Sequence, residues 1–174
     1  MYFELTEEQL MIKQAARDFA QNVLKPGVID RDREMRYPYE EVKQMGELGF
    51  LGMMVSPEYG GGGMDTMSYV LAMEEISKVD SSCSVIMSVN NSLVCWGLEQ
   101  FGSEEQKRKY LPRLASGEII GSFCLSEPEA GSDATSQRTT AVDMGDHYLL
   151  NGIKNWITSG GSSKIHLVIA QTDV

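Results

Sequence analysis

The strongest constraint on the fold is a change in hydrophobic spacing near Gly117. Before this residue, apolar side chains recur three and four positions apart, which is the spacing of an amphipathic helix. After it, short apolar runs alternate with turn residues, a pattern typical of strands. Helices followed by strands indicate two structural units. We therefore expect an α+β protein, with an all-α N-terminal helical domain over residues 1–117 and the first part of an antiparallel β-barrel or sandwich domain over residues 118–174.

Two capping-box motifs predict helix starts in the first part. In Thr6–Gln9 and in Ser103–Gln106, a hydroxyl and a glutamine side chain are spaced to satisfy each other's backbone donors. The first motif predicts a helix over 7–23 that stops before Pro26, and the second a helix over 104–114 that Gly117 ends. Further helices are expected over 39–48, 66–76 and 82–101, with the charged run 30–36 as a solvated connection.

The least polar segment, residues 82–101, is expected to form a helix that is buried all round. Asn90, Asn91 and Ser92 lie within it, and buried polar groups need partners. Two explanations stay open, because these side chains either bond neighbouring helices or meet a substrate. On the preceding helix, Glu74 and Glu75 point about 100° apart and cannot flank one bond, so a solvated face is expected for both.

Strand signals fill the second part, and the Asn151-Gly152 pair predicts a two-residue hairpin turn. The glycine run 60–63 lacks the Lys-Ser/Thr of a phosphate loop, so we expect a flexible loop there. The expected strands cover residues 119–126, 138–143, 147–150, 153–158 and 165–171.

Composition excludes several classes of function. A net charge of −10 and a pI near 4.6 argue against a nucleic-acid partner, which needs a basic surface. No basic and apolar leader and no run of about 18 apolar residues occurs, so we expect a cytoplasmic protein without a membrane span.

Cys83, Cys95 and Cys124 are too scattered for a disulfide framework or a zinc site, so buried thiols and no metal are expected. His147 and His166 lie in strand-like runs and are expected to be structural.

Two stretches carry the polar chemistry of the second part. In Phe123–Asp133, an apolar strand breaks into residues that favour turns and offer backbone amides and hydroxyls. In Asn155–Thr158, an indole and a hydroxyl lie two residues apart, and so on one side of an extended chain. One aromatic face and two rows of hydrogen-bonding groups suit a flat, partly polar ring system.

The segments CLSEPEAGSD and YLLNGIKNWITSGG resemble the two signature segments of the acyl-CoA dehydrogenases, flavoenzymes that oxidise the Cα–Cβ bond of acyl-CoA thioesters. The resemblance extends through ELTEEQ, MGELGFLGMMVSPEYGGGGMD and IMSVNNSL, and the last of these is most similar to the short-chain, butyryl-CoA branch. It implies FAD as the hydride acceptor. The residues agree, because the polypeptide has no hydride acceptor of its own and no dinucleotide fingerprint for a nicotinamide.

The resemblance also implies residue roles. Ser126 would bond the pyrimidine edge of the flavin, Trp156 would pack on the ring face away from the substrate, and Thr158 would lie near the reactive nitrogen. Ser132 would lie where the cofactor and the pantetheine arm of the substrate meet, and Met87 and Asn90 would shape the end of the acyl cavity. The implied cofactor-binding residues are Phe123, Leu125, Ser126, Gly131, Ser132, Trp156, Ile157 and Thr158.

This chain departs from the family pattern at one position and in extent. Glu129 stands where the family commonly has glycine, and if that position needed a positive φ it would cost about 1 kcal/mol or more. Family members are longer and take their catalytic glutamate from a C-terminal helical domain. The resemblance thus implies a fragment without its catalytic base, predicted to be inactive alone. The expected partners are acyl-CoA, an electron-transfer flavoprotein as acceptor, and copies of the chain in a homotetramer.

Two other functions stay open at this point. A stand-alone, non-catalytic module would bind acyl-CoA or a protein partner through the same cavity and an exposed strand edge. An oxygen-using relative such as an acyl-CoA oxidase would differ in how well the reduced flavin is shielded from oxygen.

Overall fold

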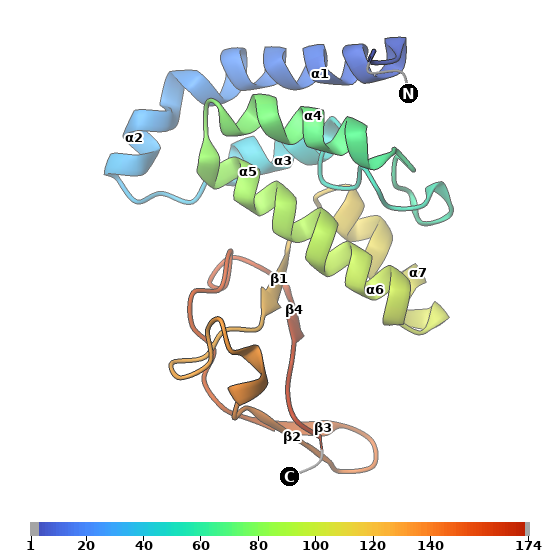
Figure 1. The fold of residues 1–174 in the computed structure, drawn as a ribbon, viewed down its shortest axis with the longest axis vertical. Coiled ribbons are helices and arrows are strands. Elements are labelled where there is room, and N and C mark those ends of the chain that lie inside the picture. The colour runs from blue at the N-terminus through green and yellow to red at the C-terminus, as the bar shows by residue number, and fades with distance from the viewer. Residues whose placement is uncertain (1–3, 173–174) are drawn as a thin grey trace.

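The computed structural model describes residues 4–172, so the outermost ends of the two predicted domains lie outside the described residues. Helices form the first part and short strands the second, as the change in spacing predicts (Figure 1). The α-helices are α1 (Glu7–Phe19), α2 (Val28–Arg33), α3 (Tyr39–Glu47), α4 (Thr66–Ser77), α5 (Ser81–Ser88), α6 (Trp96–Phe101) and α7 (Glu104–Ala115).

Capping fixes the helix starts. Both predicted capping boxes are present, and in the first the Gln9 amide donates to Thr6 Oγ1 (3.2 Å) while the Thr6 amide donates to Gln9 Oε1 (3.1 Å). Asp65 and Asp80 cap α4 and α5 through their carboxylates. After α7, Gly117 adopts φ +73°, which glycine tolerates without strain, and the helical part ends there.

The expected helix end before Pro26 is wrong. From α1 the chain continues through a π-helical turn (Ala20–Leu24) and a 3-10 turn (Lys25–Gly27) into α2. Pro26 falls at the start of the 3-10 turn, where its missing N–H breaks no helical hydrogen bond. The charged run 30–36 is therefore not simply a solvated connection.

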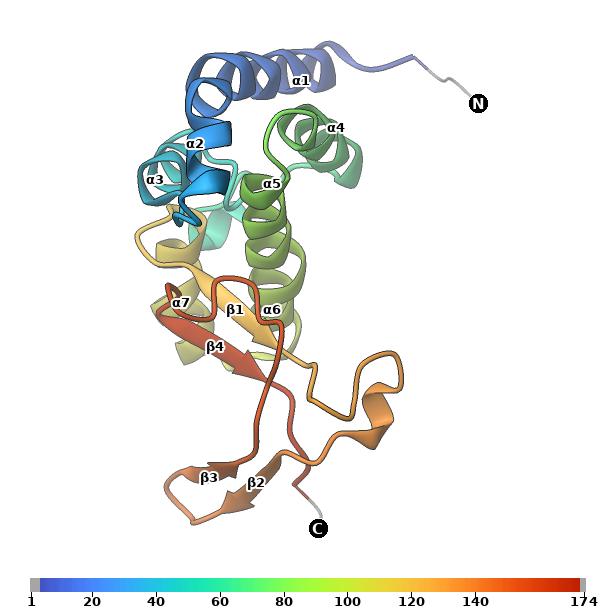
Figure 2. The same cartoon turned by 90° about the vertical axis from the view of Figure 1, so that its left-hand side faces the viewer.

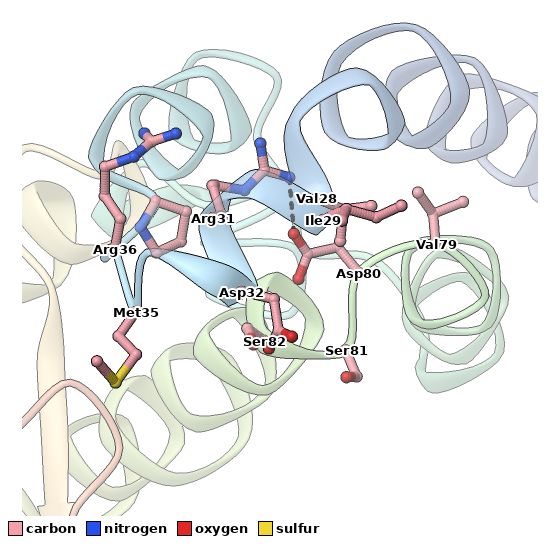
Figure 3. Close-up of a pocket in the computed structure, with 11 residues that line it drawn as sticks. Val28, Ile29, Arg31, Asp32, Met35, Arg36, Val79, Asp80, Ser81 and Ser82 are labelled. Atoms are coloured by element: carbon pink, nitrogen blue, oxygen red, sulfur yellow. Dashed lines mark hydrogen bonds and ion pairs between the residues drawn. The ribbon is translucent and has the colours of Figure 1, made fainter.

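Arg31 of α2 is buried, with 5% of its side chain exposed. Its Nη2 donates to Asp80 (2.8 Å) and to the Leu24 carbonyl (2.7 Å), and its Nη1 donates to Glu41 (2.7 Å). One guanidinium thus joins the end of the first helical run, α3 and the cap of α5. Figure 3 shows the pair of Arg31 and Asp80 beside a cavity of about 460 Å³ between α2 and the start of α5.

A second buried charge corrects the expected solvated face of α4. Glu75 is 4% exposed and accepts hydrogen bonds from Arg17 Nε (3.0 Å) and Lys78 Nζ (3.0 Å). The hydrogen bond from Arg17 outweighs burial and lowers the pKa of Glu75 to about 2. Glu74 is half-exposed, as expected.

The helical core lies between α1, α3, α4 and α5, and a second cluster lies where α6, α7 and the first strand meet. Figure 2 shows α5 and α6 continuing as one long helix toward the β part, joined by a π-helical stretch (Val89–Cys95). Predicted burial on all sides is wrong for this helix, because Val85, Trp96 and Phe101 are about half or more exposed along one side. Cys83, Cys95 and Cys124 are buried free thiols, as expected.

The β part contains two separate two-stranded sheets. Strand β2 (Thr140–Asp143) pairs antiparallel with β3 (Tyr148–Asn151), as expected for part of an antiparallel β-barrel or sandwich. Strand β1 (Gly121–Cys124), however, pairs with β4 (Ile165–Val168) in parallel. The expected hairpin turn at Asn151-Gly152 is wrong, because Asn151 lies in β3 and the turn spans residues 144–147, with Gly145 at φ +96°. The segment 153–158 is not a strand.

The glycine run 60–63 forms the predicted loop, but backbone bonds fix it. The amides of Gly61, Gly62 and Gly63 donate to the carbonyls of Ser56 (3.2 Å), Gly52 (2.9 Å) and Val55 (2.9 Å).

Candidate functional site

The two stretches singled out by their polar chemistry lie side by side. Strand β1 ends at Cys124, and the chain then opens into Leu125 and Ser126, both partly exposed. The backbone amide of Asn155 donates to the Ser126 carbonyl at 2.8 Å. This bond brings the turn after β1 next to the residues that carry the indole.

An ion pair fixes the base of this arrangement. Lys154 Nζ donates to Glu127 Oε1 (2.7 Å) and to the Leu125 carbonyl (2.9 Å). The Glu127 carboxylate also accepts from the backbone amides of Arg138 (2.6 Å) and Thr139 (3.0 Å). These bonds, that from Lys154 first, lower the pKa of Glu127 to about 2. A carboxylate held so firmly in its ionised form is unsuited to accept a proton from a substrate.

Trp156 is the most exposed aromatic side chain of the described residues, at 94%. Its φ is +59° and that of Ser159 is +60°, so the chain turns here. The expected extended chain, with Trp156 and Thr158 on one side, is wrong. Left-handed geometry costs a non-glycine residue about 1–2 kcal/mol and tends to mark functional segments when the surroundings hold it in place.

Thr158 is held through its backbone, and its hydroxyl takes part in no hydrogen bond among the described residues. The Thr158 carbonyl accepts from Ser122 Oγ (2.8 Å), and Ser122 Oγ also bonds Ser163 Oγ (2.7 Å). The hydroxyls of Ser126 and Ser132 are likewise not used by other described residues. These hydroxyls therefore remain free to bind a ligand.

The loop after β1 is open at its tip. Backbone bonds between Glu127 and Ala130 close a tight turn, after which Gly131 and Ser132 are exposed. A Cβ added to Gly131 would meet no heavy atom within 4 Å, which leaves room for a ligand. The strain considered for Glu129 does not arise, because its φ is not positive; its carboxylate pairs with Arg138 at 2.6 Å.

Two cavities border the site. One of about 470 Å³ lies beside Thr158 and Ser159 and is lined on its helical side by Tyr37, Val85 and Ile86. The other, of about 540 Å³ and mostly apolar, lies between α6 and the face of β1 and β4 that carries Phe123 and Leu167; it is also lined by Leu93 and Trp96. Sequence reasoning did not single out Tyr37, Val85 or Ile86, because they come from distant segments. It also did not single out Ser159, whose bond to Tyr37 no local pattern indicates.

Met87 and Asn90, predicted to shape the acyl cavity, are fully buried in the helical core. Asn90 Nδ2 donates to the carbonyls of Leu51 (2.9 Å) and Leu114 (3.1 Å), and its Oδ1 accepts from the Gly121 amide (3.2 Å). Of the two open explanations, these bonds support the one in which Asn90 ties neighbouring elements. A contact of either residue with a substrate stays a prediction.

The site fits a flavin better than it fits a metal. An exposed indole, three uncommitted hydroxyls and an open loop tip offer stacking and hydrogen bonds to a planar, polar ring. No group of three or more potential metal ligands exists within residues 4–172. In the same range, no helix has the length and apolar character needed to cross a membrane.

Comparisons with known proteins identify the family of the chain. The chain matches the family described as "Acyl-CoA dehydrogenase, N-terminal domain" over residues 6–118 and the one described as "Acyl-CoA dehydrogenase, middle domain" over residues 122–174. It is 47% identical over 173 residues to the short-chain specific acyl-CoA dehydrogenase of Clostridium acetobutylicum, covering 99% of this chain and 46% of that protein.

Solved structures give the same result. The butyryl-CoA dehydrogenase of Megasphaera elsdenii has a TM-score of 0.94 at 40% identity, covering 100% of this chain and 46% of its own. A glutaryl-CoA dehydrogenase of Mycobacterium smegmatis in complex with FADH2 has a TM-score of 0.93 at 40% identity, covering 97% and 44%. The chain spans less than half the length of these proteins. Because the two matched domains together cover nearly all of the residues, the chain belongs to the acyl-CoA dehydrogenase family.

Proposed function

We propose that the polypeptide with these residues oxidises the Cα–Cβ bond of a short-chain acyl-CoA to the 2-enoyl thioester, with FAD as the hydride acceptor. The observation that carries the proposal is the meeting of Ser126 with the segment that holds Trp156 and Thr158, through the 2.8 Å bond from Asn155. Family membership and the similarity to short-chain and butyryl-CoA dehydrogenases support it.

In this proposal, bound FAD supplies the acceptor for the hydride that leaves the β-carbon. Trp156 would stack on one face of the ring, and Ser126 would bond its pyrimidine edge. The Thr158 hydroxyl would donate near the reactive nitrogen, where a preorganised donor stabilises negative charge as it develops. Phe123, Leu125, Gly131, Ser132 and Ile157 would complete the surface around the cofactor.

The acyl group would enter the cavity beside Thr158. Hydride transfer needs the reacting atoms about 3–3.5 Å apart, so the β-carbon must lie next to the residue that faces the reactive nitrogen. Val85 and Ile86 line that cavity of about 470 Å³ with aliphatic side chains, which suit an acyl group. Met87 follows Ile86 in α5 and is fully buried, so it would act on chain length through packing.

The catalytic base would come from the C-terminal helical domain that family members have. Among the described carboxylates near the site, Glu127 is ion-paired with Lys154 and Glu129 with Arg138. Neither is available to remove the α-proton. We therefore propose that residues 1–174 alone do not turn over an acyl-CoA, and that the complete polypeptide forms a homotetramer in the cytoplasm and passes its electrons to an electron-transfer flavoprotein.

The test uses the complete natural polypeptide. Bleaching of its flavin absorbance is followed against acyl-CoA thioesters of graded length, with the 174-residue chain measured in parallel. The expected result is bleaching that is fastest with butyryl-CoA and absent for the 174-residue chain. A yellow protein whose flavin bleaches with no thioester would contradict the proposal, as would butyryl-CoA turnover by the shorter chain.

A further inference from the structure

The loop after Trp156 is fixed from both parts of the molecule. On the β side, the Asn155 amide donates to the Ser126 carbonyl, and Ser122 Oγ donates to the Thr158 carbonyl. On the helical side, the hydroxyl of Tyr37 bonds Ser159 Oγ at 3.1 Å. Tyr37 lies in the short connection between α2 and α3, more than a hundred residues earlier in the chain.

Ser159 is a strained residue that takes part in three hydrogen bonds of its own. Its φ is +60°, and its carbonyl accepts from the amides of Ser162 (2.9 Å) and Ser163 (2.8 Å). Its side chain bonds Tyr37. A left-handed serine persists only where its surroundings determine its geometry, so the bond from Tyr37 bears directly on the conformation of the residue that follows Thr158.

Tyr37 also shares a cavity with the site. It lines the space of about 470 Å³ together with Thr158, Ser159 and the aliphatic side chains of α5. Burial raises the pKa of its phenol, so the hydroxyl stays protonated and available for a hydrogen bond at neutral pH. The same side chain therefore contacts the wall of the cavity and the loop that carries the indole and the Thr158 hydroxyl.

The fold contains a matched comparison for this contact. The hydroxyl of Tyr39 bonds Ser162 Oγ, also at 3.1 Å, and its ring lies 4.6 Å from that of Tyr37. However, Ser162 is four residues beyond Thr158 and has no positive φ, and Tyr39 is 61% exposed. The two tyrosines thus make equivalent bonds to the same loop, but only that of Tyr37 acts next to Thr158.

We propose that Tyr37 is a positioning residue, which through Ser159 fixes the loop 156–159 relative to the cavity on the helical side. This inference rests on the proposed function for its kinetic consequence, because Thr158 is the residue expected next to the reactive nitrogen. The effect of Tyr37 on the conformation of the loop 156–159 does not depend on the proposed function.

The structural arm measures hydrogen–deuterium exchange of a peptide spanning 155–163 in the complete polypeptide without cofactor. Amides of Asn155, Gly160, Ser162 and Ser163 are hydrogen-bonded in this span. Tyr37→Phe and Ser159→Ala are each expected to speed exchange about five-fold, the effect of losing one hydrogen bond. Because both remove the same bond, the double variant should exchange no faster than either single variant, and Tyr39→Phe should stay within two-fold of the parent.

The kinetic arm measures butyryl-CoA oxidation by the loaded enzyme. We expect Tyr37→Phe to lower kcat about ten-fold with KM within two-fold, since displacing a reacting group costs up to about a hundred-fold. The proposal is overturned if exchange in the span is unchanged by Tyr37→Phe, if the effects of Tyr37→Phe and Ser159→Ala multiply, or if Tyr39→Phe equals Tyr37→Phe. If no thioester is oxidised by the parent, the proposed function fails, while the exchange arm still decides the role of Tyr37.

Discussion

Replacing Arg31 with methionine tests the buried charges that join three helices. The change removes the ion pairs with Asp80 and Glu41 and leaves their carboxylates, 5% and 13% exposed, without a cation. It also leaves the Leu24 carbonyl without its donor. Breaking a buried pair from one side costs about 3–5 kcal/mol, and the methionine stem recovers only part of the packing. We therefore expect Arg31→Met to lower the free energy of unfolding by about 3–5 kcal/mol.

The assay is urea unfolding followed by circular dichroism, where a loss of this size shifts the midpoint by about 2 M if the slope is near 2 kcal/mol per molar. Arg33→Met on the same helix is the control, because Arg33 is 75% exposed and its pair with Asp30 is long, at 3.6 Å. An exposed pair of this kind contributes under about 1 kcal/mol. Equal midpoint shifts for the two variants would refute the reasoning.

The dependence on pH adds a second check. Burial raises the pKa of Asp80, but the bonds from Arg31 and from the Cys83 amide bring it below its ordinary value of 3.8. The stability that Asp80 contributes in the parent is therefore present above pH 3.8 and lost as pH falls through the lower folded value. In Arg31→Met the bond from Arg31 is gone, so burial dominates and the pKa of Asp80 rises. The difference in the free energy of unfolding between parent and variant should therefore narrow below about pH 4. This account would be contradicted if the difference in the free energy of unfolding widened below pH 4. It would also be contradicted if adding Asp80→Asn to Arg31→Met lowered the free energy of unfolding further.

Three further outcomes are expected. Asn90→Ala should cost about 3 kcal/mol in the same unfolding assay, because it leaves the Leu51 carbonyl and the Gly121 amide unpaired and removes one donor from the Leu114 carbonyl, whereas Ser92→Ala should cost under about 1 kcal/mol. Trp156→Ala should raise the Kd for FAD about five- to ten-fold in a flavin-fluorescence titration, with Trp96→Ala within two-fold. The pKa of Glu127 is about 2 in the folded protein, against an ordinary 4.5. The stability that its carboxylate contributes through the Arg138 and Thr139 amides should therefore be lost as pH falls from 4.5 to 2, and these amides should lose their protection from hydrogen exchange. Unchanged protection at pH 2 would contradict this.

Local signals predicted the helical part well. These signals are the capping boxes at Thr6 and Ser103 and the glycine after α7. In each of them the interacting residues lie within one turn of helix, so the interaction can be predicted from neighbouring residues in the sequence. Two of the errors in this part concern charged side chains. Arg31 and Glu75 were expected in solvent, but each is buried because its partner comes from another helix, 49 residues away for Arg31 with Asp80 and 58 for Glu75 with Arg17. No local spacing indicates such a pair.

In the β part, the error at Asn151-Gly152 has a steric reason. A Cβ at Gly152 would lie 2.2 Å from Thr139 Oγ1, so this glycine is needed where two segments cross and not for a turn. The turn that does form uses Gly145, whose amide donates to Asp143 Oδ1 at 2.8 Å. Glycine thus occurs at both positions, 145 and 152, and only the tertiary contact with Thr139 shows that Gly152 does not form the turn.

The candidate site is predicted from residue types, and that prediction stays untested; the extended conformation expected for its second stretch is wrong for one physical reason. An indole and hydroxyls next to turn residues indicate a polar ring site, but a positive φ at Trp156 is disfavoured locally, so no propensity predicts it. Hydrogen bonds with the Ser126 carbonyl and with the hydroxyls of Ser122 and Tyr37 hold that geometry, and all three residues lie far away in the sequence. Since these bonds come from both the helical and the β part, the loop can keep its strained residues only when the two parts are docked. Changes at the domain contact should therefore alter the site before they alter either core.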